Sequence, residues 1–278
     1  MQLNLRWSTV LLLLCFQVSV CVSAQSYKRI VSLNGTVTEI VCDLGFQQQI
    51  VGVDVTSTWP ADMDKVPKVG HNRNITAEPV LTLQPDLILS TTNFLSPPVI
   101  AQFKNVGVKQ VMVDQEYSIA GTKKLITEIA AVLQVPEKGA ALCKRLDEEQ
   151  QALHIASQHK KVLFIYARGA GTMMVAGEAT PMDKMINLAG AKNAVSGFND
   201  FKPLTAESLV AANPDVILLF DTGLQSVGGI DGLLKIPGVA QTTAGKNRKV
   251  IVMDGQLLSG FSPRVIGAVK ELSQKING

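Results

Sequence analysis

The sequence predicts an α/β protein built from two related lobes, because one helix-and-strand unit occurs twice. TAEPVLTLQPDLILST, which begins at Thr76, matches TAESLVAANPDVILLF, which begins at Thr205, at a constant offset of 129 residues. Each threonine is a favourable helix N-cap, and a Pro-Asp pair ends the helix before a short apolar run that is typical of a parallel strand buried on both faces. Solenoid repeats recur roughly every 20–50 residues, so we expect two Rossmann-like lobes related by duplication instead.

Length and composition are compatible with this architecture. The chain has 278 residues, of which 46% are hydrophobic, so it can bury a substantial core as one large domain or two smaller ones. The net charge of +3 is small and dispersed, and no run of Lys and Arg is interleaved with aromatic residues. A nucleic-acid partner is therefore not expected.

Residues 1–24 have the pattern of a signal peptide. Arg6 supplies a positive charge, Val10–Val22 is an apolar run too short for a membrane span, and Val22-Ser23-Ala24 is a small-residue cleavage site. We therefore expect export across a bacterial inner membrane into the periplasm. A lipid anchor on Cys21 is the alternative.

Two cysteines, Cys42 and Cys143, remain in the mature chain, and both lie in helix-like segments far apart in sequence. Cysteines in an oxidising compartment often pair. Small, buried, unpaired cysteines are equally compatible with these segments, so the sequence leaves both possibilities open.

The first lobe is expected to span residues 25–117. Asn34 opens its first helix, which Gly45 ends. A polar connection rich in Gly, Asn, His and Pro precedes the repeated unit. Besides that unit, the expected strands are Arg29–Leu33, Ile50–Val53 and Gln110–Val113, and the expected helices are Val37–Leu44 and Pro97–Asn105.

Residues 118–159 are expected to form a helical connection. Ile119–Leu133 has the pattern of one helix, which Pro136 interrupts. Glu137–Gln158 is rich in Ala, Leu, Lys, Glu and Gln and nearly free of helix breakers. This stretch predicts one long rigid helix of about 30 Å that joins the lobes.

The second lobe is expected to span residues 160–278 and to repeat the same programme. Its first strand, Lys161–Tyr166, is followed by a glycine-rich turn, Arg168–Gly171. Thr180-Pro181 begins a helix that Gly190 ends. After the repeated unit, the sequence predicts a strand at Val250–Met253 and a last helix at Val265–Ile276.

Motifs for catalysis are missing. The chain has no G-x-S-x-G and no Walker-type Gly-Lys-Ser or Gly-Lys-Thr, and Met174 stands where a dinucleotide fingerprint starting at Gly169 needs its third glycine. We therefore do not expect an enzyme.

Only one of the three histidines has the setting of a ligand. His154 and His159 fall on the expected bridging helix among Gln and Lys, where solvated side chains are normal. His71 lies on a loop at the carboxyl side of the first lobe, where open α/β sheets bind their ligands. One histidine cannot by itself build a zinc or manganese site.

These features together resemble the substrate-binding proteins of bacterial ABC importers for metal complexes, siderophores and cobalamin. Four segments are most similar to the periplasmic haem-binding proteins of haem importers: VGHNRNITAE, ARGAGTMMVAGEATPMDKMI, GGIDGLLKIPGVAQTTAGKNRKVIVMD and GFSPR. The resemblance implies the class III periplasmic binding protein fold and a monomer that captures haem b between its lobes. It also implies delivery to an inner-membrane permease without any reaction. Cobalamin or a ferric siderophore on the same scaffold is the alternative.

The resemblance also implies a set of site residues. Relatives commonly show Gly-Tyr-x-Arg, with an iron-ligating tyrosine, where this chain has Gly70-His71-Asn72-Arg73. His71 is then the axial ligand, which imidazole can be, and Arg73 is its polar neighbour. Relatives often carry an arginine in the loop where this chain reads Asp221-Thr222-Gly223. Because that arginine is absent here, the resemblance does not indicate which residues contact the haem propionates. Further candidates around the haem are Arg168 on the opposite face, Trp59 at the edge of the cleft, and Met173 and Met174, which either ligate or pack.

The repeated glutamates have a separate role in the family that this chain resembles. One glutamate per lobe meets arginines of the permease, and the matching positions are Glu78 and Glu207. Both also lie at the start of a helix, where a negative charge compensates the helix dipole. The two roles are compatible.

Overall fold

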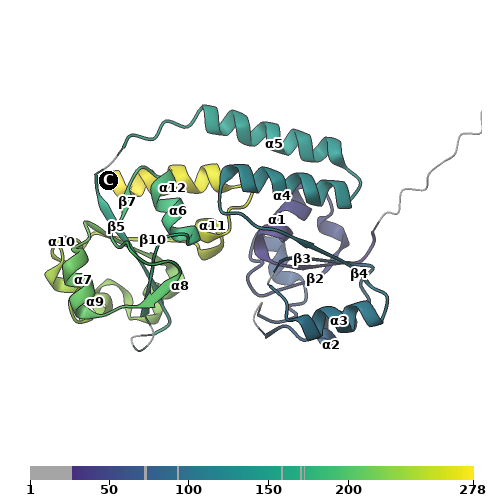
Figure 1. Ribbon diagram of the computed structural model, residues 1–278, viewed down its shortest axis with the longest axis horizontal. Coiled ribbons are helices and arrows are strands. Elements are labelled where there is room, and N and C mark those ends of the chain that lie inside the picture. Colours follow the sequence, from purple (N-terminus) through teal and green to yellow (C-terminus); the bar gives the residue numbers. More distant parts are fainter. Residues whose placement is uncertain (1–26, 72–73, 93, 158, 170, 172) are drawn as a thin grey trace, which may run out of the picture.

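The computed structural model describes residues 27–278, apart from residues 72–73, 93, 158, 170 and 172. Two α/β lobes lie side by side beneath a layer of helices that runs across both (Figure 1). The predicted signal peptide lies outside the described residues. The expected domain limits of 25–117, 118–159 and 160–278 stay a prediction. Within the described part of the chain, no helix combines the length and the apolar character needed to cross a membrane.

The first lobe contains one parallel sheet of four strands in the order β2-β1-β3-β4. Strand β3 is buried along its whole length, as the apolar run of the repeated unit predicts. The side chain of Asn34 caps the first helix by accepting hydrogen bonds from the backbone N–H groups of Thr36 and Val37. The elements are β1 (Ile30–Leu33), α1 (Gly35–Asp43), a 3-10 turn (Gln47–Gln49), β2 (Ile50–Val53), a second 3-10 turn (Ala61–Lys65), α2 (Ala77–Leu81), β3 (Leu87–Thr91), α3 (Pro97–Asn105) and β4 (Lys109–Val113).

The second lobe repeats this topology in its parallel strands. Strand β5 (Lys161–Ala167) pairs with β7 (Lys192–Asn193) on one side and with β9 (Val216–Phe220) on the other, and β9 pairs with β10 (Val250–Met253). The order β7-β5-β9-β10 therefore corresponds to β2-β1-β3-β4. Helix α7 (Ala206–Ala212) leads into β9 as α2 leads into β3.

The repeated Pro-Asp pair has the same structural role in each lobe. Asp86, just before β3, accepts hydrogen bonds from the backbone N–H groups of Lys28 and Arg29 at 2.8 and 3.1 Å. Asp215, just before β9, accepts one from the N–H of Lys161 at 2.8 Å. Each aspartate thus ties the third parallel strand of its lobe to the beginning of the first, which explains why the pair occurs in both repeats.

An antiparallel ribbon distinguishes the second lobe from the first. Strand β6 (Met173–Ala176) pairs with the last three residues of β5, and β8 (Phe201–Pro203) pairs with β6. The sequence did not predict these strands, because they are short and their pairing is not local. The remaining elements of this lobe are α6 (Pro181–Leu188), α8 (Asp221–Ser226), α9 (Gly229–Leu234), a 3-10 turn (Val239–Gln241), α10 (Thr243–Lys246) and α11 (Gly255–Ser259).

The layer above the sheets consists of α4 (Ile119–Val132), α5 (Pro136–Gln151) and α12 (Val265–Asn277) (Figure 1). Helix α5 carries the chain from the first lobe towards the second, as expected, but it ends seven residues before the predicted end at Gln158. After the end of α5, Leu153 and Ile155 pack against the hydrophobic core. The placement of His154 and His159 on the bridging helix is therefore wrong; both are exposed in the connection that follows it.

Both described cysteines are free and only partly buried. Burial, together with the nearby charges of Asp43 and Glu39, raises the pKa of the Cys42 thiol to about 12. Of the two possibilities left open by the sequence, the structure shows unpaired cysteines packed beside the core.

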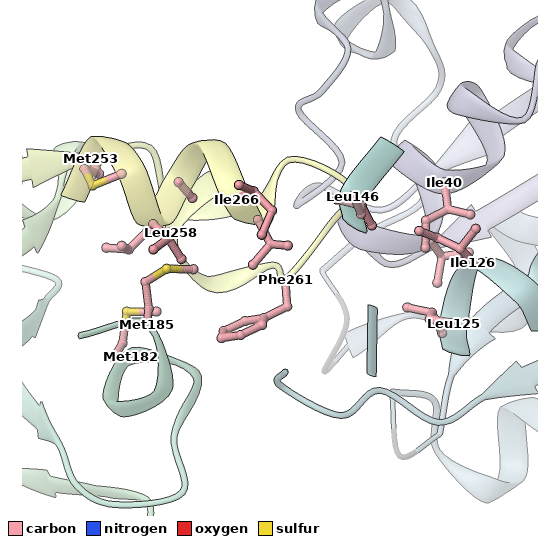
Figure 2. Packing of buried hydrophobic residues seen from close by; sticks show 14 of the residues in the cluster. Ile40, Leu125, Ile126, Leu146, Met182, Met185, Met253, Leu258, Phe261 and Ile266 are labelled. Atoms are coloured by element: carbon pink, nitrogen blue, oxygen red, sulfur yellow. The ribbon is translucent and has the colours of Figure 1, made fainter. Parts of the chain in front are cut away.

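One hydrophobic cluster extends through both lobes. Ile40, Leu125 and Ile126 belong to its first-lobe side, and Met185 and Leu258 belong to its second-lobe side. Phe261 lies between these two groups (Figure 2) and is 1% exposed. Because the lobes share this cluster, separating them would expose apolar surface to water.

An ion pair between a buried carboxylate and a partly buried guanidinium joins the lobes next to this cluster. The guanidinium of Arg264 donates to both oxygens of Glu39, at 2.8 Å from Nε and 2.6 Å from Nη2, and Glu39 is 2% exposed. The ring of Trp59 covers the guanidinium at 4.5 Å. Around this pair, Gln115 Nε2 donates to the carbonyl oxygen of Gly260 at 2.7 Å, and Thr122 Oγ1 donates to that of Phe261 at 2.7 Å. We call these contacts the interlobe seam.

Replacing Arg264 with Leu should lower the free energy of unfolding by about 3–5 kcal/mol, because Glu39 would keep a buried charge without its counterion. Urea denaturation followed by circular dichroism measures the effect. Arg145→Leu is the matched control: its ion pair with Asp43 is exposed on both sides and should contribute much less. If both variants lost the same free energy of unfolding, the Glu39–Arg264 pair would contribute no more than an exposed ion pair.

Candidate functional site

A large cleft lies between the two lobes. It has a volume of about 1370 Å³ and is lined from both sides by residues at the carboxyl ends of parallel strands. Thr91 and Asp114 mark the ends of β3 and β4, and Ala167 and Phe220 the ends of β5 and β9. Open α/β sheets bind their ligands at this edge. Because both lobes have the same topology, the ligand-binding edges of both sheets face the same cleft.

His71 lines the cleft from the first lobe. Its loop is fixed to the end of β2 by the hydrogen bond from Val69 N–H to the carbonyl oxygen of Val53, at 2.9 Å. Gly70 has a φ of 124°, a conformation that side chains rarely adopt, and it turns the chain into the cleft just before the histidine. His71 is partly exposed, so its imidazole is accessible to a ligand. Arg73 lies outside the described residues, and its role stays a prediction.

Tyr166 and Arg168 line the opposite wall of the cleft. Tyr166 is the penultimate residue of β5, and its ring is held edge-on by Phe220 and Phe201 at centroid distances of 6.2 and 6.3 Å. The guanidinium of Arg168 lies 5.4 Å from the centre of the same ring. The structure therefore brings the predicted Arg168 to the cleft that contains His71, together with a tyrosine that the sequence analysis missed.

A signal for Tyr166 was present in the sequence. Tyr166-Ala167-Arg168 is itself a Tyr-x-Arg, the pattern that relatives show at the loop where this chain has His71. We interpreted Tyr166 only as the end of an apolar strand. Strand patterns do not indicate which residue at the end of a strand faces a ligand.

Aromatic side chains line the cleft from both lobes. Phe94 and Tyr117 come from the first lobe, and Tyr166 and Phe220 come from the second. Burial raises the pKa of Tyr117, and its ring packs against Phe261 at 5.6 Å. Aromatic rings stack readily on flat conjugated ligands, so these walls suit a planar ring system.

The structure does not bring three of the predicted residues to this cleft. Trp59 is 46% exposed but covers Arg264 in the interlobe seam. Met173 and Met174 lie on β6, opposite Ala167 and Tyr166, and neither is among the residues that line the cleft. Met173 packs against the hydrophobic cluster of the second lobe.

Glu78 and Glu207 occupy equivalent, exposed positions in the first turns of α2 and α7. Each helix leads directly into a parallel strand, so its N-terminus lies at the carboxyl edge of the sheet, the edge that faces the cleft. The side chain of Thr205 completes a capping box with Ser208, whereas Thr76 makes no such side-chain bond. Both glutamates are therefore presented on the same side of the molecule as the cleft.

The chain belongs to the periplasmic binding protein family, whose model matches residues 30–257. The solved structures similar to it include the periplasmic heme-binding protein RhuT from Roseiflexus sp. RS-1 in apo form. RhuT is 38% identical, the match covers 90% of this chain and 97% of that one, and the TM-score is 0.86. The heme-binding protein HmuT is 33% identical over 91% of this chain and 85% of that one, with a TM-score of 0.81. Solved structures of HmuT variants carry alanine in place of a tyrosine, of the arginine two residues after it, or of a histidine.

Curated relatives agree with this assignment. The uncharacterized ABC transporter substrate-binding lipoprotein YvrC of Bacillus subtilis is 31% identical, with 90% of this chain and 80% of YvrC covered. The vitamin B12-binding protein of Vibrio vulnificus is 23% identical, with 95% and 94% covered. The protein is thus a substrate-binding component of an ABC importer. It acts outside the cytoplasm, binds a ligand for delivery to a membrane permease, and is not an enzyme.

Proposed function

We propose that the ligand is haem, captured in the interlobe cleft and handed to an inner-membrane haem permease by a monomer. The observation that supports this most is the pairing of His71 on one wall with Tyr166 and Arg168 on the other. Imidazole and tyrosine oxygen are both ligands of haem iron. The same three residue types, with the same spacing of tyrosine and arginine, were chosen for replacement in HmuT.

The two walls have complementary chemistry in this proposal. His71 offers a neutral nitrogen to iron, and Tyr166 offers an oxygen that binds as phenolate. The Arg168 guanidinium lies 5.4 Å from the ring centre of Tyr166, on the same wall of the cleft. Arg73, two residues after His71 in the sequence, is proposed as a second cation of the site. The proposed ligand set thus extends the one expected from sequence by Tyr166.

Residues 1–24 act in this proposal as a cleavable signal peptide that delivers the mature chain to the periplasm. The family assignment supports an extracytoplasmic protein. Glu78 and Glu207 then dock the loaded protein on the permease, one lobe on each half. Their exposure on the side of the cleft supports this role.

Cobalamin is the second candidate ligand, because the sequence match with the vitamin B12-binding protein of Vibrio vulnificus covers nearly the whole chain. Adding hemin, cobalamin or a ferric siderophore to the purified mature protein separates the candidates. We expect a Soret band shifted from that of free hemin, with saturable binding. Tight binding of cobalamin and no hemin complex would overturn the haem proposal.

His71→Ala should weaken hemin binding by at least roughly tenfold, about 1.4 kcal/mol, and move the ferric Soret band, because iron loses a protein ligand. Absorption titration measures both effects. His154→Ala is the control, since His154 is exposed outside the cleft. A spectrum and affinity that match the control would refute ligation by His71.

Tyr166→Phe should weaken binding of ferric haem more than that of ferrous haem, because phenolate prefers the more highly charged iron. The phenyl ring keeps the contacts with Phe201 and Phe220, so the change isolates the hydroxyl oxygen. Titrations under oxidising and reducing conditions test it, with Tyr27→Phe as the control in the core. Equal losses in both oxidation states would count against an iron–phenolate bond.

Glu78→Arg combined with Glu207→Arg should leave hemin binding intact and abolish uptake through the permease. Reversing a charge in the first turn also costs about 0.3–1 kcal/mol per helix, so a matched control is needed. Glu137→Arg provides it, because Glu137 is an exposed acid in the first turn of α5, away from the cleft. Uptake that survives the double reversal would remove the docking role.

A further inference from the structure

The charged side chains that line the cleft are unevenly distributed along it. Three of them are carboxylates: Asp114 follows β4, Asp221 follows β9, and Asp254 follows β10. Among the described lining residues the only guanidinium or ammonium group is that of Arg168, which follows β5. His71 supplies the imidazole of the opposite wall.

The interlobe seam closes the cleft at the end where two of these acids lie. Asp114 directly precedes Gln115, whose Nε2 donates to the carbonyl oxygen of Gly260 across the seam at 2.7 Å. Asp254 caps α11, and the side chain of Gln256 in that helix reaches Glu39 Oε1 at 3.4 Å. Both acids therefore lie beside contacts that hold the lobes together.

The strand order of the second lobe places the other charges along the wall. Met253 of β10 pairs with Phe220 of β9, so Asp254 and Asp221 follow neighbouring strands at the same level. Strand β5 pairs with the other side of β9. The wall therefore presents Asp254, Asp221 and Arg168 in that order, from the closed end of the cleft outwards.

None of the three carboxylates is neutralised by a cation within the described residues. Asp221 accepts a hydrogen bond from the backbone N–H of Thr222 at 2.7 Å, and Asp254 accepts one from that of Leu257 at 2.7 Å. Asp114 accepts one from the hydroxyl of Thr92. Neutral donors leave the negative charge in place, and a cleft with low-dielectric walls concentrates the field of such charges.

We infer that Asp114, Asp221 and Asp254 set the orientation of the ligand by keeping carboxylates away from the closed end of the cleft. A ligand with an anionic edge is then bound with that edge at the open side, next to Arg168. For haem, which rests on the proposed function, both propionates point to the open side and the opposite edge enters first.

The test compares hemin with hemin dimethyl ester, which lacks the two carboxylates, by absorption titration at low ionic strength. Asp221→Asn combined with Asp254→Asn should raise the affinity for hemin on the order of threefold to tenfold, as expected for like charges separated by roughly 10 Å in a partly solvated cleft. The affinity for the ester should stay within about twofold. Asparagine is as good an N-cap as aspartate, so α11 keeps its cap.

Glu128→Gln combined with Glu271→Gln is the control, because it changes the net charge equally at partly exposed helix positions that do not line the cleft. Arg168→Gln should have the opposite effect, weakening hemin about tenfold and the ester little. The proposed orientation would be refuted if Asp221→Asn with Asp254→Asn changed the affinity for hemin no more than the control does. It would also be refuted if the affinities for hemin and for the ester changed equally. A protein that forms no hemin complex at all would overturn the proposed function, and the orientation of haem with it.

Discussion

The ion pair between the buried carboxylate of Glu39 and the guanidinium of Arg264 is the interaction on which the binding site depends. Glu39 is 2% exposed, and a carboxylate so deeply buried is stable only while its counterion is in place. This pair and the hydrogen bonds around Gly260 and Phe261 hold the two lobes at one separation. The cleft therefore exists before any ligand arrives, and a preformed site avoids part of the ordering cost of binding.

The two lobes have the same topology, yet the two walls of the cleft carry different side chains. The strand order is the same in both lobes, so both carboxyl edges face the same space, and each contributes one candidate iron ligand, His71 or Tyr166. The second lobe adds a ribbon to β5, whose last residues lead to Arg168. The equivalent helices α2 and α7 present Glu78 and Glu207 on the same side, and we propose that a permease with two halves binds them there.

The repeated unit made most of the fold predictable. Strand β2 has the predicted bounds, and α12 differs from its prediction by one residue. Such bounds are predictable because the spacing of apolar residues and the residues that form turns are local features of the sequence. The ribbon of β6 and β8 depends on pairing between distant segments, which no local pattern encodes. The site was only partly predictable for the same reason. His71 was recognisable from its loop, whereas the contact of Trp59 with Arg264 and the exposure of Tyr166 to the cleft depend on tertiary packing.

The most direct test of this account is a crystal structure of the mature protein with hemin. We predict that the porphyrin lies in the interlobe cleft, with both His71 and Tyr166 bonded to iron and the propionates at the open side beside Arg168. Hemin bound elsewhere on the molecule, or iron held in the cleft by other atoms while His71 and Tyr166 turn away from it, would contradict the account.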